Sequence, residues 1–285
     1  MSRRGARGAA LILVMWLVVL LAALVGAFAL AARIEYMQGR TLHAGVVTEQ
    51  AARAGLEYAM TRIAQDDPRL RWLPDGRPYR MDFDGLQVEV RIIDESGKID
   101  LNGADIQLLA ALLRVAGAEQ AQAEAIAAAI LDWRDGDDLT QAQGGAEDPQ
   151  YAAAGLPYGA KDAPFETVAE VLQVLGMTPA LFARIEPSLT THTGLPTADA
   201  RYAGALVLQA LGIDPEPVLA ARERPPAPDD ASALGSGSGT YSIDSQARLG
   251  DGRRSVLRAV VRTGASGVPG AAFTVLRWEE GATPR

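Results

Sequence analysis

A run of 24 residues without a charge, Ala9–Ala32, limits what this chain can become. Three arginines and no acidic residue precede it. As a helix rising about 1.5 Å per residue, the run would be about 36 Å long, which is enough to cross a hydrocarbon core about 30 Å thick. Basic residues before such a segment favour a cytoplasmic N-terminus. Residues 33–285 are therefore expected on the far side of the membrane.

The apolar run has three interpretations. It could be an ordinary signal anchor, or a secretory signal cut after the small residues of Ala29–Ala31. It could also follow a prepilin-type leader that ends at Gly8 and is removed on the cytoplasmic side. The apolar cores of signal peptides are shorter, about 7–15 residues. The chain also stays free of proline from Arg33 to Gln65, with apolar residues at helical intervals, until Asp66–Pro68 ends the pattern. This continuation favours a pilin-like stem helix.

The composition excludes several kinds of functional site. The chain has no cysteine, so disulfides, thiolate nucleophiles and cysteine-bound zinc are excluded. It has two histidines, His43 and His192, too few for a multi-histidine metal site. The net charge of −8 argues against a general nucleic-acid binder, which needs basic side chains to meet phosphates. Nothing specifies an acid–base pair in a pocket, so we do not expect an enzyme.

Strand patterns occur in two groups that are far apart. Tyr79–Asp84 and Leu86–Asp94 are joined by an Asp-Gly turn, and residues 240–249, 254–264 and 271–280 are rich in β-branched or aromatic residues. The intervening sequence is helical. We predict an α+β fold, in which a pilin-like stem helix packs on an antiparallel sheet and a large all-α domain is inserted between strands. The predicted divisions are a leader (1–8), the transmembrane and periplasmic parts of the stem (9–32 and 33–66), the first sheet segment (67–101), the insert (102–222), a linker (223–239) and the C-terminal strands (240–285).

The insert contains an internal repeat. Leu172–Pro179 and Leu208–Pro215 share the pattern of a helix, a glycine, a helix N-cap and a proline, and a looser version surrounds Gly117. These are helix–hairpin–helix units of a SAM-like domain. Such units often bind DNA backbones through exposed amides, but proline removes an amide at each turn. Residues 100–222 also hold 17 acidic and 6 basic residues. A scaffold role is therefore favoured over nucleic-acid binding.

One acidic stretch could carry specific chemistry. Within Leu131–Tyr151 lie six carboxylates: Asp132, Asp135, Asp137, Asp138, Glu147 and Asp148. Their repulsion disfavours a compact loop unless a cation collects them, and oxygen ligands on a flexible loop suit calcium. The spacing is not that of an EF-hand. The alternatives are a solvated acidic loop and, from Asp135–Asp137 alone, metal-dependent glycosyl transfer, for which no nucleotide-binding βαβ pattern is present.

Several segments together resemble one family, the K-type minor pseudopilins of type II secretion (the GspK family). They are the leader with its apolar run, SGKIDLN at Ser96–Asn102, DWRDGDD with GAED-x-x-Y, PFETVAEVLQVLGMTP, and FTVLRWEE near the C-terminus. The resemblance implies cleavage by prepilin peptidase after Gly8 and N-methylation of Ala9. It also implies calcium in the loop Asp132–Asp148. Thr190–Gly204 matches poorly the Asn-rich second motif common among relatives.

The resemblance also implies a place at the tip of a pseudopilus. Leu13, the fifth residue of the mature chain, stands where most pilins carry a glutamate that pairs with the subunit ahead. We expect a single-pass inner-membrane protein, cytoplasmic at its N-terminus and otherwise periplasmic. Its expected partners are I- and J-type minor pseudopilins, prepilin peptidase and secreted cargo, and it would support the export of folded proteins. The alternatives are a membrane-anchored DNA-uptake protein and a periplasmic hydrolase.

Overall fold

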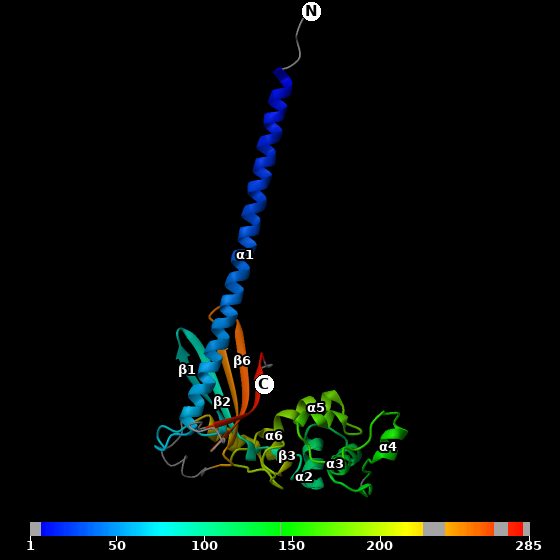
Figure 1. Cartoon of the computed structure of the whole chain (residues 1–285). Coiled ribbons are helices and arrows are strands. Elements are labelled where there is room, and N and C mark those ends of the chain that lie inside the picture. Colours follow the sequence, from blue (N-terminus) through cyan, green and yellow to red (C-terminus); the bar gives the residue numbers. More distant parts are fainter. Residues whose placement is uncertain (1–6, 143, 225–236, 265–272, 282–285) are drawn as a thin grey trace, which may run out of the picture.

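The chain begins with one long helix, α1 (Arg7–Ile63), of 57 residues. The computed structural model describes residues 7–142, 144–224, 237–264 and 273–281. Helix α1 runs from the apolar segment into the predicted periplasmic part without a break, and it ends slightly before the predicted Gln65. Figure 1 shows its N-terminal half standing clear of the rest of the molecule, while its C-terminal half lies against a sheet.

The sheet has five strands in the order β1-β2-β5-β6-β7, and all neighbours are antiparallel. The strands are β1 (Asp75–Phe83), β2 (Leu86–Asp94), β5 (Thr240–Arg248), β6 (Arg254–Thr263) and β7 (Phe273–Glu280). The first strand starts earlier than the predicted Tyr79 and ends at Phe83. A register shift between Asp75 and Pro78, with Gly76 at φ +86°, interrupts the alternating pattern there.

Small residues let α1 lie close to the sheet. Ala51, Ala52 and Ala59 are buried on the face of α1 that meets the sheet. At Gly55, a Cβ atom would lie 2.5 Å from Ser245 Oγ and 2.6 Å from a Val88 methyl carbon. The predicted stem helix on an antiparallel sheet is confirmed, and its core depends on this short helix–sheet distance.

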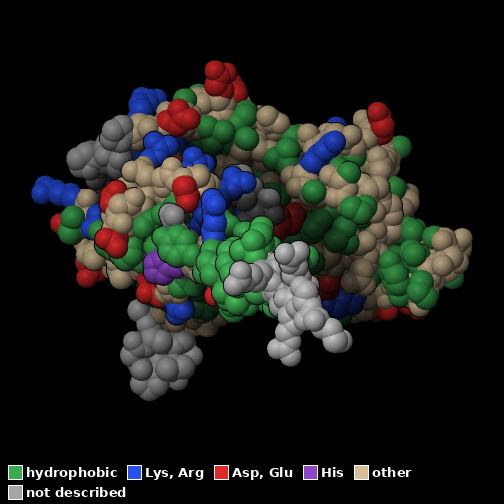
Figure 2. Space-filling model, turned by 90° about the horizontal axis from the view of Figure 1, so that it is seen from above, with side chains coloured by type: hydrophobic (Ala, Val, Ile, Leu, Met, Phe, Trp, Pro, Cys, Tyr) green, Lys and Arg blue, Asp and Glu red, His purple; other side chains and the backbone are tan. Residues whose placement is uncertain are grey.

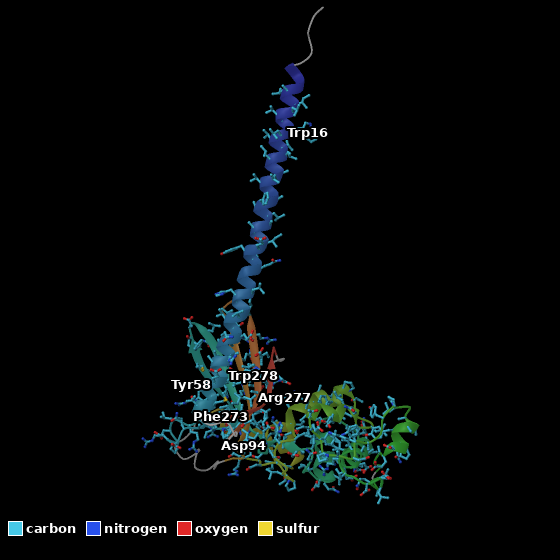
Figure 3. All side chains as sticks on the ribbon, in the orientation of Figure 1. Trp16, Tyr58, Asp94, Phe273, Arg277 and Trp278 are labelled. Atoms are coloured by element: carbon cyan, nitrogen blue, oxygen red, sulfur yellow. The ribbon has the colours of Figure 1, made fainter. Side chains whose placement is uncertain are left out.

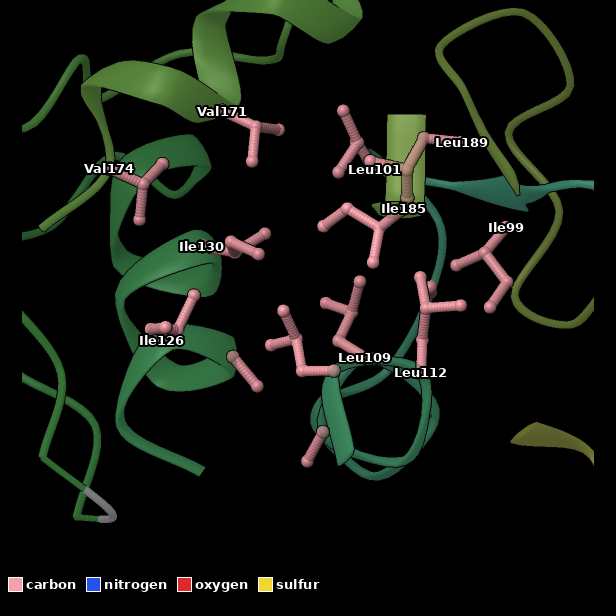
Figure 4. Close-up of a cluster of buried hydrophobic side chains, with 14 of the residues drawn as sticks. Ile99, Leu101, Leu109, Leu112, Ile126, Ile130, Val171, Val174, Ile185 and Leu189 are labelled. Atoms are coloured by element: carbon pink, nitrogen blue, oxygen red, sulfur yellow. The ribbon is translucent and has the colours of Figure 1, made fainter. Parts of the chain in front are cut away.

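The insert leaves the sheet after β2 and returns at β5. Its elements are η1 (Glu95–Gly97), β3 (Ile99–Asp100), α2 (Ile106–Val115), α3 (Gln120–Arg134), α4 (Asp148–Ala153), η2 (Val168–Gln173), α5 (Pro179–Ile185), η3 (Glu186–Ser188), β4 (Leu189–Thr190), α6 (Ala205–Ala210) and α7 (Pro215–Arg222). Aliphatic side chains from these elements form a second, separate core (Figure 4). Strands β3 and β4 pair in parallel. The insert is therefore not all-α, and it begins before the predicted residue 102.

The predicted helix–hairpin–helix turns are present. Their glycines adopt positive φ angles at Gly117 (+100°), Gly176 (+84°) and Gly212 (+76°). Thr178 Oγ1 accepts the Leu181 amide at 3.2 Å, and Asp214 Oδ1 accepts the Glu216 amide at 3.0 Å, so both residues act as helix N-caps. The segment that leads into Gly176 is a short 3₁₀ helix, η2, rather than the α-helix we predicted.

Candidate functional site

The acidic stretch connects two helices of the insert. Asp132 belongs to the last turn of α3, Asp135 is the residue that ends α3, and Glu147 precedes the first turn of α4. Asp132 is 0% and Glu147 3% exposed. The sequence suggested that these carboxylates lie on a flexible or solvated loop, but Asp132 and Glu147 are buried at helix ends.

The loop backbone closes tightly around Asp132. The amide of Gln141 donates to Asp132 Oδ1 at 3.2 Å. A Cβ atom on Gly145 would lie 1.9 Å from Asp132 Oδ2, so only glycine fits at this position. Residues 141 and 145 thus approach the carboxylate from the loop, and the chain is folded back onto the end of α3.

Two carboxylate oxygens in this region, Asp135 Oδ1 and Glu147 Oε1, are buried and have no hydrogen-bond partner among the residues that the structure describes. Burial, followed by the charges of Asp132, Asp135, Asp162 and Asp138, raises the pKa of Glu147 to about 7. Burial also raises the pKa values of Asp132 and Asp135. Buried polar oxygens are normally satisfied. Burial and the charge of Asp137 outweigh the charge of Arg134, which lowers the pKa of Asp135, so the net effect on this group is still to raise the pKa.

The remaining predicted residues divide into two groups. Asp137 and Asp138 are exposed, and Asp137 Oδ1 accepts the Leu139 amide at 2.9 Å. Asp148, although next to Glu147, faces another segment: a Cβ atom on Gly159 would lie 1.6 Å from Asp148 Oδ1. The structure therefore brings Asp132, Asp135 and Glu147 together and turns Asp148 away from them.

Asp162 is a member of this group that the sequence did not reveal. Its charge helps to raise the pKa of Glu147, although it lies outside the acidic stretch. Its backbone has φ +55°, and Asp84 is the one other non-glycine residue at positive φ among those the structure describes. A lone aspartate after Lys161 gives no local signal of this role.

The donor set suits a hard cation. Within the described residues, which omit position 143 of this loop, no three acidic or histidine side chains already form a metal-binding group. The two buried oxygens, Asp135 Oδ1 and Glu147 Oε1, nevertheless have no hydrogen-bond partner among the described residues, and carboxylate oxygens are the ligands that calcium prefers. A cation bound here would draw its ligands from Asp132, Asp135 and Glu147, and Asp138 and Asp162 lie close enough to add to the negative charge at Glu147.

Aromatic side chains cluster next to the acidic stretch. Trp133 lies with its ring centroid 5.9 Å from that of Tyr151 and 6.3 Å from that of Phe165. Tyr158 closes the group at 5.7 Å from Tyr151. The Tyr151 hydroxyl accepts the Leu175 amide at 3.1 Å, which ties α4 to the segment after η2. These rings form a cluster, the aromatic base, that lies between the end of α3 and α4, the two helices that the acidic stretch connects.

The second candidate region is the N-terminal half of α1. Its most apolar 18-residue window has a mean hydropathy of 2.9 and is 0% buried, so length and composition allow it to cross a membrane. Leu13 is 71% exposed, as is Trp16, which points away from the helix in Figure 3. Figure 2, seen from above, shows green hydrophobic side chains gathered where the stem is viewed end-on. Gly8 and Ala9 lie in the first turn of α1, and processing between them stays a prediction.

Comparisons with known proteins point to one family. Residues 90–194 match the family model for protein K of the type II secretion system. The chain is 29% identical to the type II secretion system protein K of Pseudomonas aeruginosa over 261 residues, which cover 82% of this chain and 77% of that relative. It is 37% identical to the protein K of Pectobacterium carotovorum over 81 residues, or 28% of this chain and 24% of that relative.

A solved structure shows the same fold. The crystal structure of the GspK-GspI-GspJ complex from enterotoxigenic Escherichia coli contains a chain that matches with a TM-score of 0.57 at 16% identity. The match covers 86% of this chain and 100% of that chain. The family match spans the end of β2, the SGKIDLN segment and the acidic loop, so it includes the features that are most specific in the sequence. The family model, the two relatives and the shared fold together support a K-type minor pseudopilin of the type II secretion system.

Proposed function

We propose that this chain is a minor pseudopilin at the tip of the type II secretion pseudopilus, where it initiates assembly and supports the export of folded proteins. The observation that carries this function is the form of α1: its apolar half is exposed wherever the structure describes it, and its other half is fixed to the sheet. An apolar helix left free in this way can pack beside the helices of other subunits. The chain acts by assembly and not by catalysis.

Its partners are I- and J-type minor pseudopilins. The support for this is the relative of the same fold, whose crystal structure is a complex of GspK with GspI and GspJ. The protein is anchored in the inner membrane by the apolar half of α1, with its N-terminus in the cytoplasm and the sheet and insert in the periplasm. Three arginines before the apolar run support this orientation.

Calcium is held in the insert by Asp132, Asp135 and Glu147. When bound, the ion supplies the positive charge that these buried and half-buried carboxylates lack. The chain's own contribution is to fold the loop around Asp132 through Gln141 and Gly145 and to hold it on the aromatic base. The cation thereby fixes the geometry of a surface that has no disulfide to brace it.

DNA uptake is the less favoured function. Pro179 and Pro215 remove an amide at the start of the helix in each hairpin, where a phosphate would otherwise be bound. Asp214 also occupies an N-cap at one of these turns, and its negative charge would repel a phosphate.

Processing at the leader is tested by the N-terminal peptide mass of the chain extracted from membranes. We expect a start at Ala9 that carries one added methyl group. A start after Ala31 would mean a soluble exported protein and would contradict a membrane-embedded stem helix. An intact start at Met1 would leave an ordinary anchored protein and would contradict pseudopilus assembly.

Leu13→Glu tests the tip position. A tip subunit has no subunit ahead of it to pair with a carboxylate at this position, and an unpaired charge in the membrane is costly. We expect at least a tenfold fall in secretion, together with less chain recovered in complexes with the I- and J-type partners. Leu13→Ile, which keeps the position apolar, should behave like the wild type. Normal secretion by Leu13→Glu at an unchanged membrane level would contradict this argument for the tip.

A further inference from the structure

The insert is joined to the sheet by two connections that lie side by side. Strand β2 ends at Asp94 and β5 begins at Thr240, and Asp94 pairs with Tyr241 across these neighbouring strands. Figure 1 shows the insert beside the end of the sheet that is distant from the N-terminus of α1. Two adjacent backbone connections alone would act as a hinge. Whether the insert can swing therefore depends on side chains at this junction, where Asp94 is labelled in Figure 3.

Asp94 binds both connections at once. Its Oδ1 accepts the Ser96 amide at 2.9 Å and the Ser96 hydroxyl at 2.6 Å, on the outgoing connection. Its Oδ2 accepts the Ser238 amide at 2.9 Å, on the returning connection. A Cβ atom on Gly237 would lie 2.1 Å from Asp94 Oδ2, so the returning chain passes as close as its backbone allows. Asp94 is 0% exposed, and it fixes the distance between the two connections.

Glu95 joins the sheet to the insert. Its Oε1 accepts the Lys98 ammonium at 2.6 Å and also the hydroxyl of Ser242 in β5. Its Oε2 accepts the hydroxyl of Thr190 in β4 at 2.5 Å. Lys98 Nζ in turn donates to Ser242 Oγ at 2.6 Å. One carboxylate therefore contacts a strand of the sheet, a strand of the insert and the connection between them.

The two charged groups of this network are buried, so each needs its partner. Glu95 is 1% and Lys98 8% exposed. Burial alone would raise the pKa of Glu95, but Lys98 and the two hydroxyls hold that pKa below its usual value. Removing one partner of a buried pair leaves an uncompensated charge inside the protein. A swing of the insert would break the bond from Thr190, so only one orientation satisfies Glu95 fully.

We propose that Asp94 and Glu95 form a junction clasp, a pair of positioning residues that holds the insert at one angle to the stem helix. Movement of α1 along the axis of a pseudopilus then moves the insert as a rigid body, without loss of displacement at the junction. The fixed angle follows from the contacts of the clasp, whereas its use in export rests on the proposed function.

The fixed angle can be measured between two spin labels. Because the chain has no cysteine, Glu49→Cys on α1 and Gln122→Cys on α3, both exposed, give a single label pair without further changes. In the full chain in detergent, we expect one narrow distance distribution by pulsed electron spin resonance. Glu95→Gln should at least double its width. Glu89→Gln is the matched control, because Glu89 pairs with Arg80 and Arg91 on the exposed face of the sheet and is 33% exposed.

Milder variants keep the test independent of folding. Ser242→Ala removes one of the two hydroxyls that donate to Glu95, and Thr190→Ala removes the other. The double variant should broaden the distance distribution while the circular dichroism spectrum stays unchanged. A distribution as narrow as the wild type in Glu95→Gln, or in the double variant if Glu95→Gln fails to fold, would overturn the proposal. Broadening with normal secretion would keep the clasp and refute its role in export, even if the proposed function is correct.

Discussion

Calcium added to the chelator-treated chain is expected to raise the melting temperature of the insert by about 8 °C at a concentration 100 times its Kd. A ligand that binds only the folded state stabilises it by about 2.7 kcal/mol under these conditions. For a domain of this size, each kcal/mol corresponds to about 3 °C. The physical source is the repulsion among Asp132, Asp135 and Glu147, which the ion replaces with attraction. Differential scanning calorimetry of the full chain in detergent measures the shift.

Magnesium is the control ion for this measurement. It demands near-octahedral geometry and gives up its water reluctantly, so it should produce a much smaller shift at the same concentration. Equal shifts with both ions would indicate general screening of the acidic loop. No shift with calcium would contradict the proposed site.

Two neighbouring substitutions separate the proposed ligands from the other acidic residues. Glu147→Gln removes the buried charge that the fold disfavours, so without calcium it should melt no lower than the wild type, and calcium should no longer raise its melting temperature. Asp148→Asn changes a residue that faces Gly159, and its response to calcium should stay within about 2 °C of the wild type. Equal loss of the response in both variants would favour a site made from all six predicted carboxylates.

The sequence predicted correctly the features that depend on local residue patterns. The 24 uncharged residues before Arg33 identify the N-terminal half of α1 by their length alone. Alternation in Leu86–Asp94 gives β2 with its observed bounds. The hairpin turns of the insert follow from a glycine, a capping side chain and a proline within four residues of one another.

The missing features depend on contacts between distant segments. Strands β3 and β4 are 2 residues each and pair across most of the insert, so no periodicity could reveal them. Glu147 and Asp148 are adjacent in sequence but face different segments, because one precedes the first turn of α4 and the other begins it. Asp94 and Glu95 look like the end of a strand, and their role becomes visible only when β5 and β4 are placed around them.

Gly103→Ala is expected to lower the free energy of unfolding of the insert by about 3 kcal/mol, near the upper end for overpacking a filled site. A Cβ atom there would lie 2.4 Å from the Leu195 carbonyl oxygen and 2.8 Å from the Gly194 carbonyl carbon. These are backbone atoms, and they cannot simply rotate away. Hydrogen exchange of peptides from the insert, in the full chain, measures the loss.

Asp100 is the reason that the opposing loop cannot retreat from a new methyl group. Its Oδ2 accepts the amides of Thr193 and Gly194, both at 2.8 Å, and it is 1% exposed. Moving this loop would break hydrogen bonds to a buried carboxylate. The loop at residues 194–195 therefore stays in place, and the steric strain of a new Cβ atom at Gly103 is not relieved. Gly204→Ala is the matched control, because it meets open space in the same domain and should cost at most about 1 kcal/mol as a helix N-cap. Equal effects of the two substitutions would show that the loop yields and that Asp100 does not hold it.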